Sequence, residues 1–202
     1  MDHLKGRRPL SVVPQTLGIE VRMWLRQPAS ATLAARRRRL AGPTGCGLCG
    51  IDSLSEAARA LPRVPTGQTT SPRAIRAALG ALLPAQRLGM VTRATHAAAW
   101  WTEGQGLVAI REDVGRHNAL DKLVGAIARA SRPADHGLLL LTSRVSVEMV
   151  QKTVALGAQI IVAISAPTAL AIETATAAGV TLIAVARDDS FEVFCGAERI
   201  IS

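Results

Sequence analysis

From residue 71 onward, short apolar runs alternate with longer segments in which apolar residues recur every three or four positions. The clearest runs are Leu138–Leu141 and Ile160–Ile164, and the segments after them end at Gly157 and Gly179. Short apolar runs of this length predict strands, and periodic segments that end at glycine predict helices. Strands that alternate with helices through short loops predict a largely parallel sheet with helices on its faces, so we expect an α/β fold.

The amino-acid composition agrees with a packed domain of this kind. Apolar residues make up 49% of the chain, whereas aromatic residues make up 2% and tyrosine is absent. A core of Ala, Val, Leu and Ile suits helices packed closely on a parallel sheet. The longest apolar stretch, Val154 to Ile172, is interrupted by Gln159, Ser165 and Pro167, so we predict no membrane span. Three cysteines, an odd number, are typical of a reducing, cytoplasmic setting.

The charge balance points to a negatively charged ligand or partner. The formal net charge is +9, from 24 Lys and Arg against 15 Asp and Glu. A basic surface attracts nucleic acid, an acidic protein or a phosphorylated cofactor. The scarcity of aromatic residues argues against single-stranded nucleic acid, and no zinc-finger or RNA-recognition pattern is present. We therefore expect a phosphate-bearing small molecule and no nucleic acid.

Polar side chains follow four successive predicted strands. They lie at residues 111–117, 143–144, 165–168 and 187–190, and arginine occurs in three of the four groups. Ligands of open α/β sheets bind beyond the carboxyl ends of the strands, and arginine suits an anionic ligand. We therefore expect an anion-binding site at this edge of the sheet.

Two histidines lie near these strand ends, and the sequence leaves their roles open. His117 stands at the start of a predicted helix, where it could donate to a phosphate, bind a metal or cap the helix. His96 begins an apolar strand, and a histidine in that position is more often a satisfied core residue.

A glycine-rich loop contains Cys46 and Cys49, spaced as Cys-x-x-Cys. This spacing lowers the pKa of a thiol, and a thiolate can attack a sulfur donor and become a persulfide. Half of a zinc site is one alternative, but zinc needs four ligands and no second close pair is present. A thioredoxin-like disulfide site is another, although no strand directly precedes the pair. Cys195, in an apolar strand, is predicted to be a core residue.

Several segments with these chemical features together resemble the FdhD/NarQ family, the formate dehydrogenase accessory sulfurtransferases. The resemblance covers about residues 36–200. The segments are Gly45–Gly50 with the preceding arginines, Thr95–Ala98, Arg111–Gly125 (R-E-D-V-G-R-H-N-A-L-D-K-L-V-G), Ser143–Lys152 and Ser165–Leu170.

The resemblance implies a three-layer α/β/α domain similar to cytidine deaminase, without its zinc chemistry, because His-x-Glu and Pro-Cys-x-x-Cys are absent. It also implies a homodimeric sulfur carrier with a persulfide on Cys46, assisted by Cys49. Sulfur would come from an IscS-like cysteine desulfurase. It would pass to the molybdenum cofactor, bis-molybdopterin guanine dinucleotide, before that cofactor enters formate dehydrogenase. We expect no tightly bound metal.

The expected organisation is a truncated N-terminal segment (residues 1–41), the Cys loop and a linker (42–70), and the α/β domain (71–202). Relatives of this kind have several tens of residues before the Cys loop, which Met1–Thr16 does not resemble. The alternative function is a non-catalytic chaperone that holds the cofactor. The expected cofactor-binding residues are His96, Arg111, Arg116, His117, Arg144, Val185, Ala186, Arg187, Asp188, Asp189 and Ser190.

Overall fold

The computed structural model describes residues 10–15, 18–24, 61–130 and 136–201 of the chain, which divides into two units, Met1–Glu56 and Ala57–Ser202. In the first unit, β1 (Leu10–Gln15) pairs antiparallel with β2 (Gly18–Met23). The sequence predicts a strand at Gly18–Leu25 but not β1, because the proline within β1 is unfavourable in a strand. No helix in the described ranges is long and apolar enough to cross a membrane.

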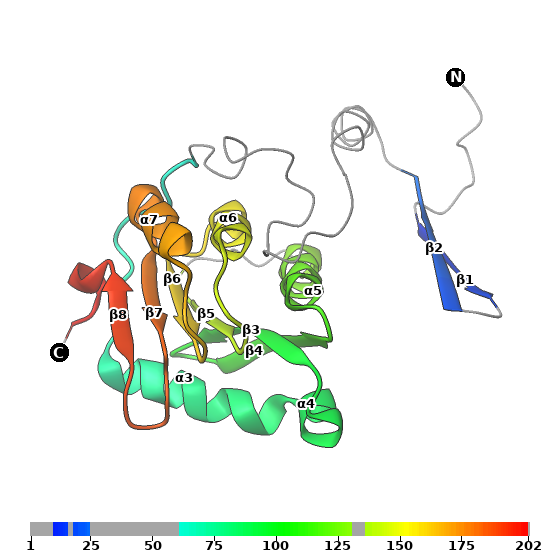
Figure 1. Cartoon of the computed structure of the whole chain (residues 1–202), viewed down its shortest axis with the longest axis horizontal. Helices are drawn as coiled ribbons and strands as arrows, with labels where there is room; N and C mark the ends of the chain where they lie inside the picture. The colour runs from blue at the N-terminus through cyan, green and yellow to red at the C-terminus, as the bar shows by residue number, and fades with distance from the viewer. Residues whose placement is uncertain (1–9, 16–17, 25–60, 131–135, 202) are drawn as a thin grey trace. The chain divides into compact units, whose positions relative to one another are not determined.

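The second unit is built on a six-stranded sheet with the order β4-β3-β5-β6-β7-β8 (Figure 1). Its strands lie close to the positions that the sequence predicts, which are residues 96–101, 107–111, 138–141, 160–164, 182–185 and 191–194. They are β3 (His96–Thr102), β4 (Gly106–Asp113), β5 (Leu138–Leu141), β6 (Ile160–Ala163), β7 (Thr181–Ala184) and β8 (Glu192–Cys195).

The sheet is mixed, so the expectation of a largely parallel sheet is wrong for its outer strands. Only the pairings of β5 with β6 and of β6 with β7 are parallel, whereas β3–β4, β3–β5 and β7–β8 are antiparallel. A parallel pair needs a long crossover connection. The turn between β3 and β4, and the helix-free loop from β7 to β8, are too short to provide one.

Helices cover both faces of this sheet, which confirms the expected three-layer α/β/α class. In Figure 1, α5, α6 and α7 lie on one face and α3 lies on the other, followed by the short helix α4. The sequence predicts each of these helices except α4, at about residues 71–86, 120–127, 146–156 and 168–178, the first with Ser71 as its N-cap. Their bounds are α3 (Pro72–Ala85), α4 (Arg87–Thr92), α5 (Arg116–Arg129), α6 (Val147–Leu156) and α7 (Ala169–Ala178).

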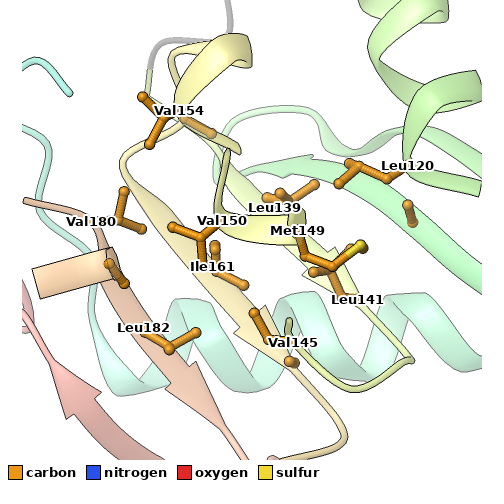
Figure 2. Close-up of a cluster of buried hydrophobic side chains, with 14 of the residues drawn as sticks. Leu120, Leu139, Leu141, Val145, Met149, Val150, Val154, Ile161, Val180 and Leu182 are labelled. Atoms are coloured by element: carbon orange, nitrogen blue, oxygen red, sulfur yellow. The ribbon is translucent and has the colours of Figure 1, made fainter. Parts of the chain in front are cut away.

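Strand β5 shows how the sheet separates two hydrophobic cores. Leu139 and Leu141 pack in the cluster with α5, α6 and α7 (Figure 2). Leu138 and Leu140 pack in the other cluster, with α3. All four side chains are at most 2% exposed. Because successive strand residues point to opposite faces, an uninterrupted apolar run is needed to bury both, and each buried leucine contributes about 2 kcal/mol.

The segment predicted as a linker before α3 lies along the α/β domain. Val64 is buried and its amide donates to the Ala178 carbonyl at 2.9 Å. The Gln68 side chain donates to the Gly137 carbonyl at 2.8 Å. Ser71 then caps α3, because its hydroxyl accepts from the Ala74 amide at 3.1 Å. These contacts join the segment to the domain that follows it.

Two glycines of this unit are expected to respond oppositely to an added methyl group. Gly80 lies inside α3 with no atom within 4 Å of an added Cβ, so Gly80→Ala should raise the free energy of unfolding by about 0.5–1 kcal/mol. At Gly137 the Cβ would collide with the Trp100 indole, so Gly137→Ala should lower it by about 1–3 kcal/mol. Urea denaturation of both variants tests this, and equal effects would contradict the packing described.

Candidate functional site

The sheet register brings the predicted strand-end groups to one edge. The parallel strands β5, β6 and β7 end there, before Thr142, Ile164 and Val185. Strand β3 is antiparallel to β5, so it begins at the same edge with His96. His96 lies opposite Asp113, which places the end of β4 beside it. Strand β8 begins there too, with Glu192 opposite Ala184. All six strands therefore present a terminus at this edge, which we call the strand-end site.

Arg116 and His117, in the first turn of α5, contribute buried polar atoms to the strand-end site. His117 Nε2 lies 3.3 Å from Glu148 Oε2 in α6, an ion-pair distance without hydrogen-bond geometry. Within the described part of the chain, Arg116 Nε and His117 Nε2 are buried and make no hydrogen bond. A buried donor without a partner costs about 1–3 kcal/mol, so both atoms are suited to binding a ligand.

The arginines at this site shift the titration of its histidines. Burial, and then the charges of Arg116 and Arg144, lower the pKa of His96. Burial, and then Arg116 and Lys152, lower the pKa of His117. Both imidazoles are therefore neutral at physiological pH, and each can donate one hydrogen bond and accept another. An anionic ligand would offset the arginine charges.

The pKa of Glu148 is raised above that of an ordinary exposed carboxylate. Burial raises its pKa, whereas a hydrogen bond from Ser146 and the charges of Arg116 and Lys152 oppose that rise. The site thus holds a carboxylate, two imidazoles and several cations in a partly desolvated region, an arrangement that is frequent at functional sites.

The loop after β7 contains a strained residue. Val185 has a φ of 52°, in the left-handed region that β-branched residues rarely adopt. Its amide donates to the Ser165 carbonyl, and the next amide, of Ala186, donates to the Ala163 carbonyl. Such strain costs about 1–3 kcal/mol and clusters at ligand-binding and active sites. The strained backbone thus coincides with the start of the predicted cofactor contact.

The rest of that loop is exposed and folds back on itself. The Arg187 amide donates to the Ser190 carbonyl at 2.7 Å. Its guanidinium Nη1 donates to the carbonyls of Ile164 and Ala186, so the side chain lies against the strand-end backbone. Asp188 and Asp189 are exposed. The Arg187 side chain therefore stays beside the strand-end site and keeps its other guanidinium donors available.

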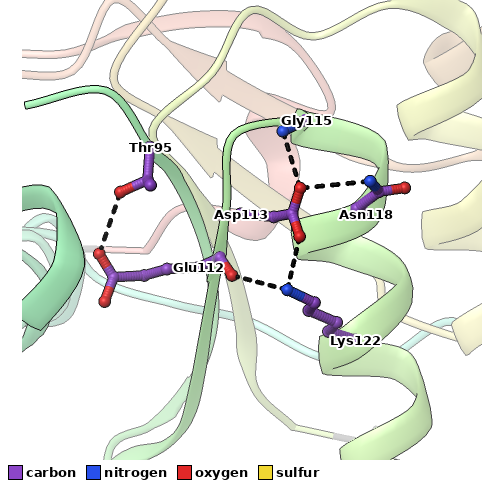
Figure 3. Close-up of polar contacts among 6 residues, drawn as sticks. All are labelled: Thr95, Glu112, Asp113, Gly115, Asn118 and Lys122. Atoms are coloured by element: carbon purple, nitrogen blue, oxygen red, sulfur yellow. Dashed lines mark hydrogen bonds and ion pairs between the residues drawn. The ribbon is translucent and has the colours of Figure 1, made fainter. Parts of the chain in front are cut away.

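Two carboxylates of the β4–α5 turn accept hydrogen bonds from other groups of the protein. Glu112 accepts from the amides of Leu88 and Gly89 at 3.0 and 2.7 Å, so it caps the start of α4. Asp113 accepts from Lys122, Gly115 and Asn118, as Figure 3 shows. Lys122 is the main reason that the pKa of Asp113 falls to about 2.

Arg111 lies apart from the other predicted anion-binding residues. It stands opposite Ala98, which packs in the core under α5, and it borders the later turns of that helix beside Lys122 and Arg129. Its Nη1 donates to the Ile110 carbonyl. The sequence predicts Arg111 at the strand end because it directly follows an apolar run, but the strand continues to Asp113.

Of the three cysteines, only Cys195 is within the described residues. It is half-buried, packs against the core and donates to the Val180 carbonyl at 3.3 Å, as expected for a core residue. Cys46 and Cys49 lie outside the described residues. No group of three or more His, Cys, Asp or Glu side chains in the described ranges is placed to hold a metal ion.

The fold and the strand-end site define a three-layer α/β/α protein that presents arginine and histidine at the carboxyl ends of its central strands. The model of the FdhD/NarQ family matches residues 9–201, a longer span than the residues 36–200 on which the sequence resemblance rests. The chain therefore belongs to the FdhD/NarQ family.

Individual relatives agree with this assignment. The chain is 50% identical over 193 residues to the sulfur carrier protein FdhD of Agrobacterium fabrum, covering 95% of this chain and 71% of the relative. It is 52% identical to the protein of the same name from Brucella abortus, covering 95% and 72%. The crystal structure of a putative formate dehydrogenase accessory protein from Desulfotalea psychrophila matches with a TM-score of 0.68 over 95% of this chain and 98% of that one. At 22% identity, that structure supports the fold alone.

Replacement of Arg116 is expected to change the pKa values of His96, His117 and Glu148 at the strand-end site. In Arg116→Ala, the pKa values of His96 and His117 should rise, because a positive charge near both imidazoles is removed. The pKa of Glu148 should rise as well, because Arg116 favours its ionised form. NMR titration of the imidazole and carboxyl resonances measures all three.

Arg73→Ala, on the exposed surface of α3, is the control and should leave these values unchanged. A fall in the pKa of Glu148 in Arg116→Ala would mean that increased solvent exposure, rather than lost charge, dominates, and would contradict this electrostatic account.

Proposed function

We propose that this protein is a sulfur carrier that supports formate dehydrogenase by passing sulfur from a cysteine desulfurase to the molybdenum cofactor. The observation that carries the proposal is about 50% identity to proteins named sulfur carrier protein FdhD over nearly the whole chain. The strand-end site supports it, because the buried arginine and histidine atoms there lack partners among the described residues. The proposal includes a cytoplasmic location and a homodimer.

The sulfur chemistry is assigned to the Cys46/Cys49 loop. The Cys46 thiolate attacks the outer sulfur of a persulfide on the desulfurase, a new S–S bond forms on Cys46, and the desulfurase thiol leaves. Cys49 can then attack Cys46, which forms a disulfide and releases the outer sulfur as sulfide. Glycine stands on both sides of Cys46 and directly after Cys49, so little side-chain bulk is attached next to either thiol in the sequence.

The strand-end site is assigned to the cofactor, here the substrate that receives sulfur. The guanine dinucleotide ends of bis-molybdopterin guanine dinucleotide carry phosphates, which match arginine donors and neutral histidines. We assign this role to residues at or beside the strand-end site, namely Arg116, Arg144, Arg187, His96 and His117. The loop from Val185 to Ser190 would lie along the nucleotide.

The alternative is a chaperone that binds the cofactor without transferring sulfur. Two observations favour it: the buried nitrogens of Arg116 and His117 that lack partners among the described residues, and the strained backbone at Val185. Both features serve ligand binding and require no thiol chemistry. The two functions differ in their dependence on Cys46.

For the sulfur carrier, intact mass after incubation with a cysteine desulfurase and cysteine should show one added sulfur. Cys46→Ser should lose that sulfur and fail to restore formate dehydrogenase activity in cells lacking the carrier, because serine cannot form a persulfide. Cys195→Ser is the control and should behave as the unchanged protein. Full activity of Cys46→Ser would establish the chaperone instead.

Guanosine diphosphate, used as a probe for the nucleotide end of the cofactor, should bind at the strand-end site. Arg116→Ala and Arg187→Ala should each weaken binding by about tenfold or more, because a charge-assisted hydrogen bond contributes about 1.5–3 kcal/mol. Binding should also weaken as salt increases. Calorimetry measures both effects, with Arg76→Ala on α3 as control. An affinity that is unchanged by these substitutions and by salt would show that the nucleotide binds outside the strand-end site.

A further inference from the structure

A second basic feature lies along the outer side of α5, away from the strand-end site. It is a shallow, open groove of about 560 Å³ between α5 and the edge strand β4. Its lining residues fall into two kinds: cations around the groove, and glycine or alanine between them. They are Arg111, Lys122, Gly125, Ala126, Arg129 and Ala130.

Nothing in the described part of the chain requires a glycine at position 125. It lies inside α5, where glycine costs about 1 kcal/mol relative to alanine. Its backbone is not left-handed, and an added Cβ would meet no atom within 4 Å. The small side chain therefore relieves no internal crowding. What it does provide, together with Ala126 and Ala130, is room at the groove for another molecule to approach the helix closely.

The charge of the groove selects a negatively charged occupant. Lys122 is already paired with Asp113, but within the described residues Arg111 and Arg129 have no acidic partner. Both arginines are exposed. Exposed guanidinium groups without acidic partners attract carboxylates, so the occupant is acidic.

The surroundings of the groove favour polypeptide over nucleic acid. No aromatic side chain lines the groove, so bases have no ring on which to stack. Glycine and alanine suit the close approach of a peptide backbone. Strand β4 is at the edge of the sheet, and an extended peptide can add to such an edge by main-chain hydrogen bonds.

We propose that the groove between β4 and α5 docks an acidic, extended segment of a protein partner, with Arg111 and Arg129 binding its carboxylates. The segment adds beside β4 and its side chains reach toward Gly125. This docking surface goes beyond sulfur transfer and cofactor binding, and it does not depend on either of them.

The test uses the full chain and a fluorescein-labelled peptide of alternating glutamate and alanine, followed by fluorescence anisotropy. The double variant Arg111→Glu/Arg129→Glu should weaken binding by about tenfold or more, because two favourable charge contacts become repulsive. The control, Arg73→Glu/Arg76→Glu on α3, makes the same change in net charge and should leave affinity within about twofold.

A second variant tests the shape of the groove separately from its charge. An added Cβ at Gly125 meets no atom within 4 Å, and leucine is a better helix former than glycine. Gly125→Leu should therefore stay folded, extend a side chain into the groove and lose peptide binding. A peptide with glutamine in place of glutamate should not bind.

Four outcomes would overturn the proposal. Equal weakening by both double variants would mean attraction by overall charge alone. Unchanged binding in Gly125→Leu would show that the peptide binds outside the groove. Absence of any binding would show that the groove is not a docking site for an acidic peptide. A fluorescent oligothymidylate that binds more tightly than the peptide and responds to the same groove variants would make the groove a nucleic-acid site.

Discussion

The burial of the central strands on both faces is the constraint on which the rest of the structure depends. Every residue of β5, β6 and β7 is buried, since α3 covers one face of the sheet and α5, α6 and α7 cover the other. Such strands can carry almost no functional polar groups along their length, because a buried polar group needs a partner. Chemistry is therefore confined to strand ends, loops and the outer surfaces of the helices.

The strand-end site shows what this confinement produces. Several strand termini and the first turn of α5 meet at one edge, so arginine, histidine and glutamate from distant parts of the chain share a partly desolvated region. Burial, and then the nearby cations, lower the pKa values of the histidines there, and the same region holds buried nitrogens without partners among the described residues. In the free protein this arrangement is costly, and a phosphate-bearing ligand would relieve the cost.

Helix α5 links the separate features of the domain. Its first turn supplies Arg116 and His117, Lys122 holds the β4–α5 turn through Asp113, and its outer side borders the groove at Gly125. One helix can serve these roles because residues three or four positions apart share a face, whereas intermediate residues point elsewhere. Its buried face, which includes Leu120 and Leu123, meanwhile anchors it to the sheet.

The sequence by itself determined the features that depend on neighbours along the chain. The Leu138–Leu141 strand, the Ser71 cap and the Gly157 helix end follow from local periodicity and backbone preferences, and the structure has all three. The family was likewise recognisable from contiguous motifs, and the comparisons confirm it. Local sequence also indicated that arginine follows β5 and β7, at Arg144 and Arg187.

Only the tertiary structure decided how those elements combine. The direction of β8, the capping of α4 by Glu112, and the position of Arg111 beside α5 all depend on contacts between residues far apart in sequence. Glu112 and Arg111 are neighbours in the chain, yet they point to opposite faces of the sheet because side chains alternate along a strand. Whether a charged residue binds a ligand, caps a helix or borders a groove is therefore set by the face it occupies and by what packs against that face.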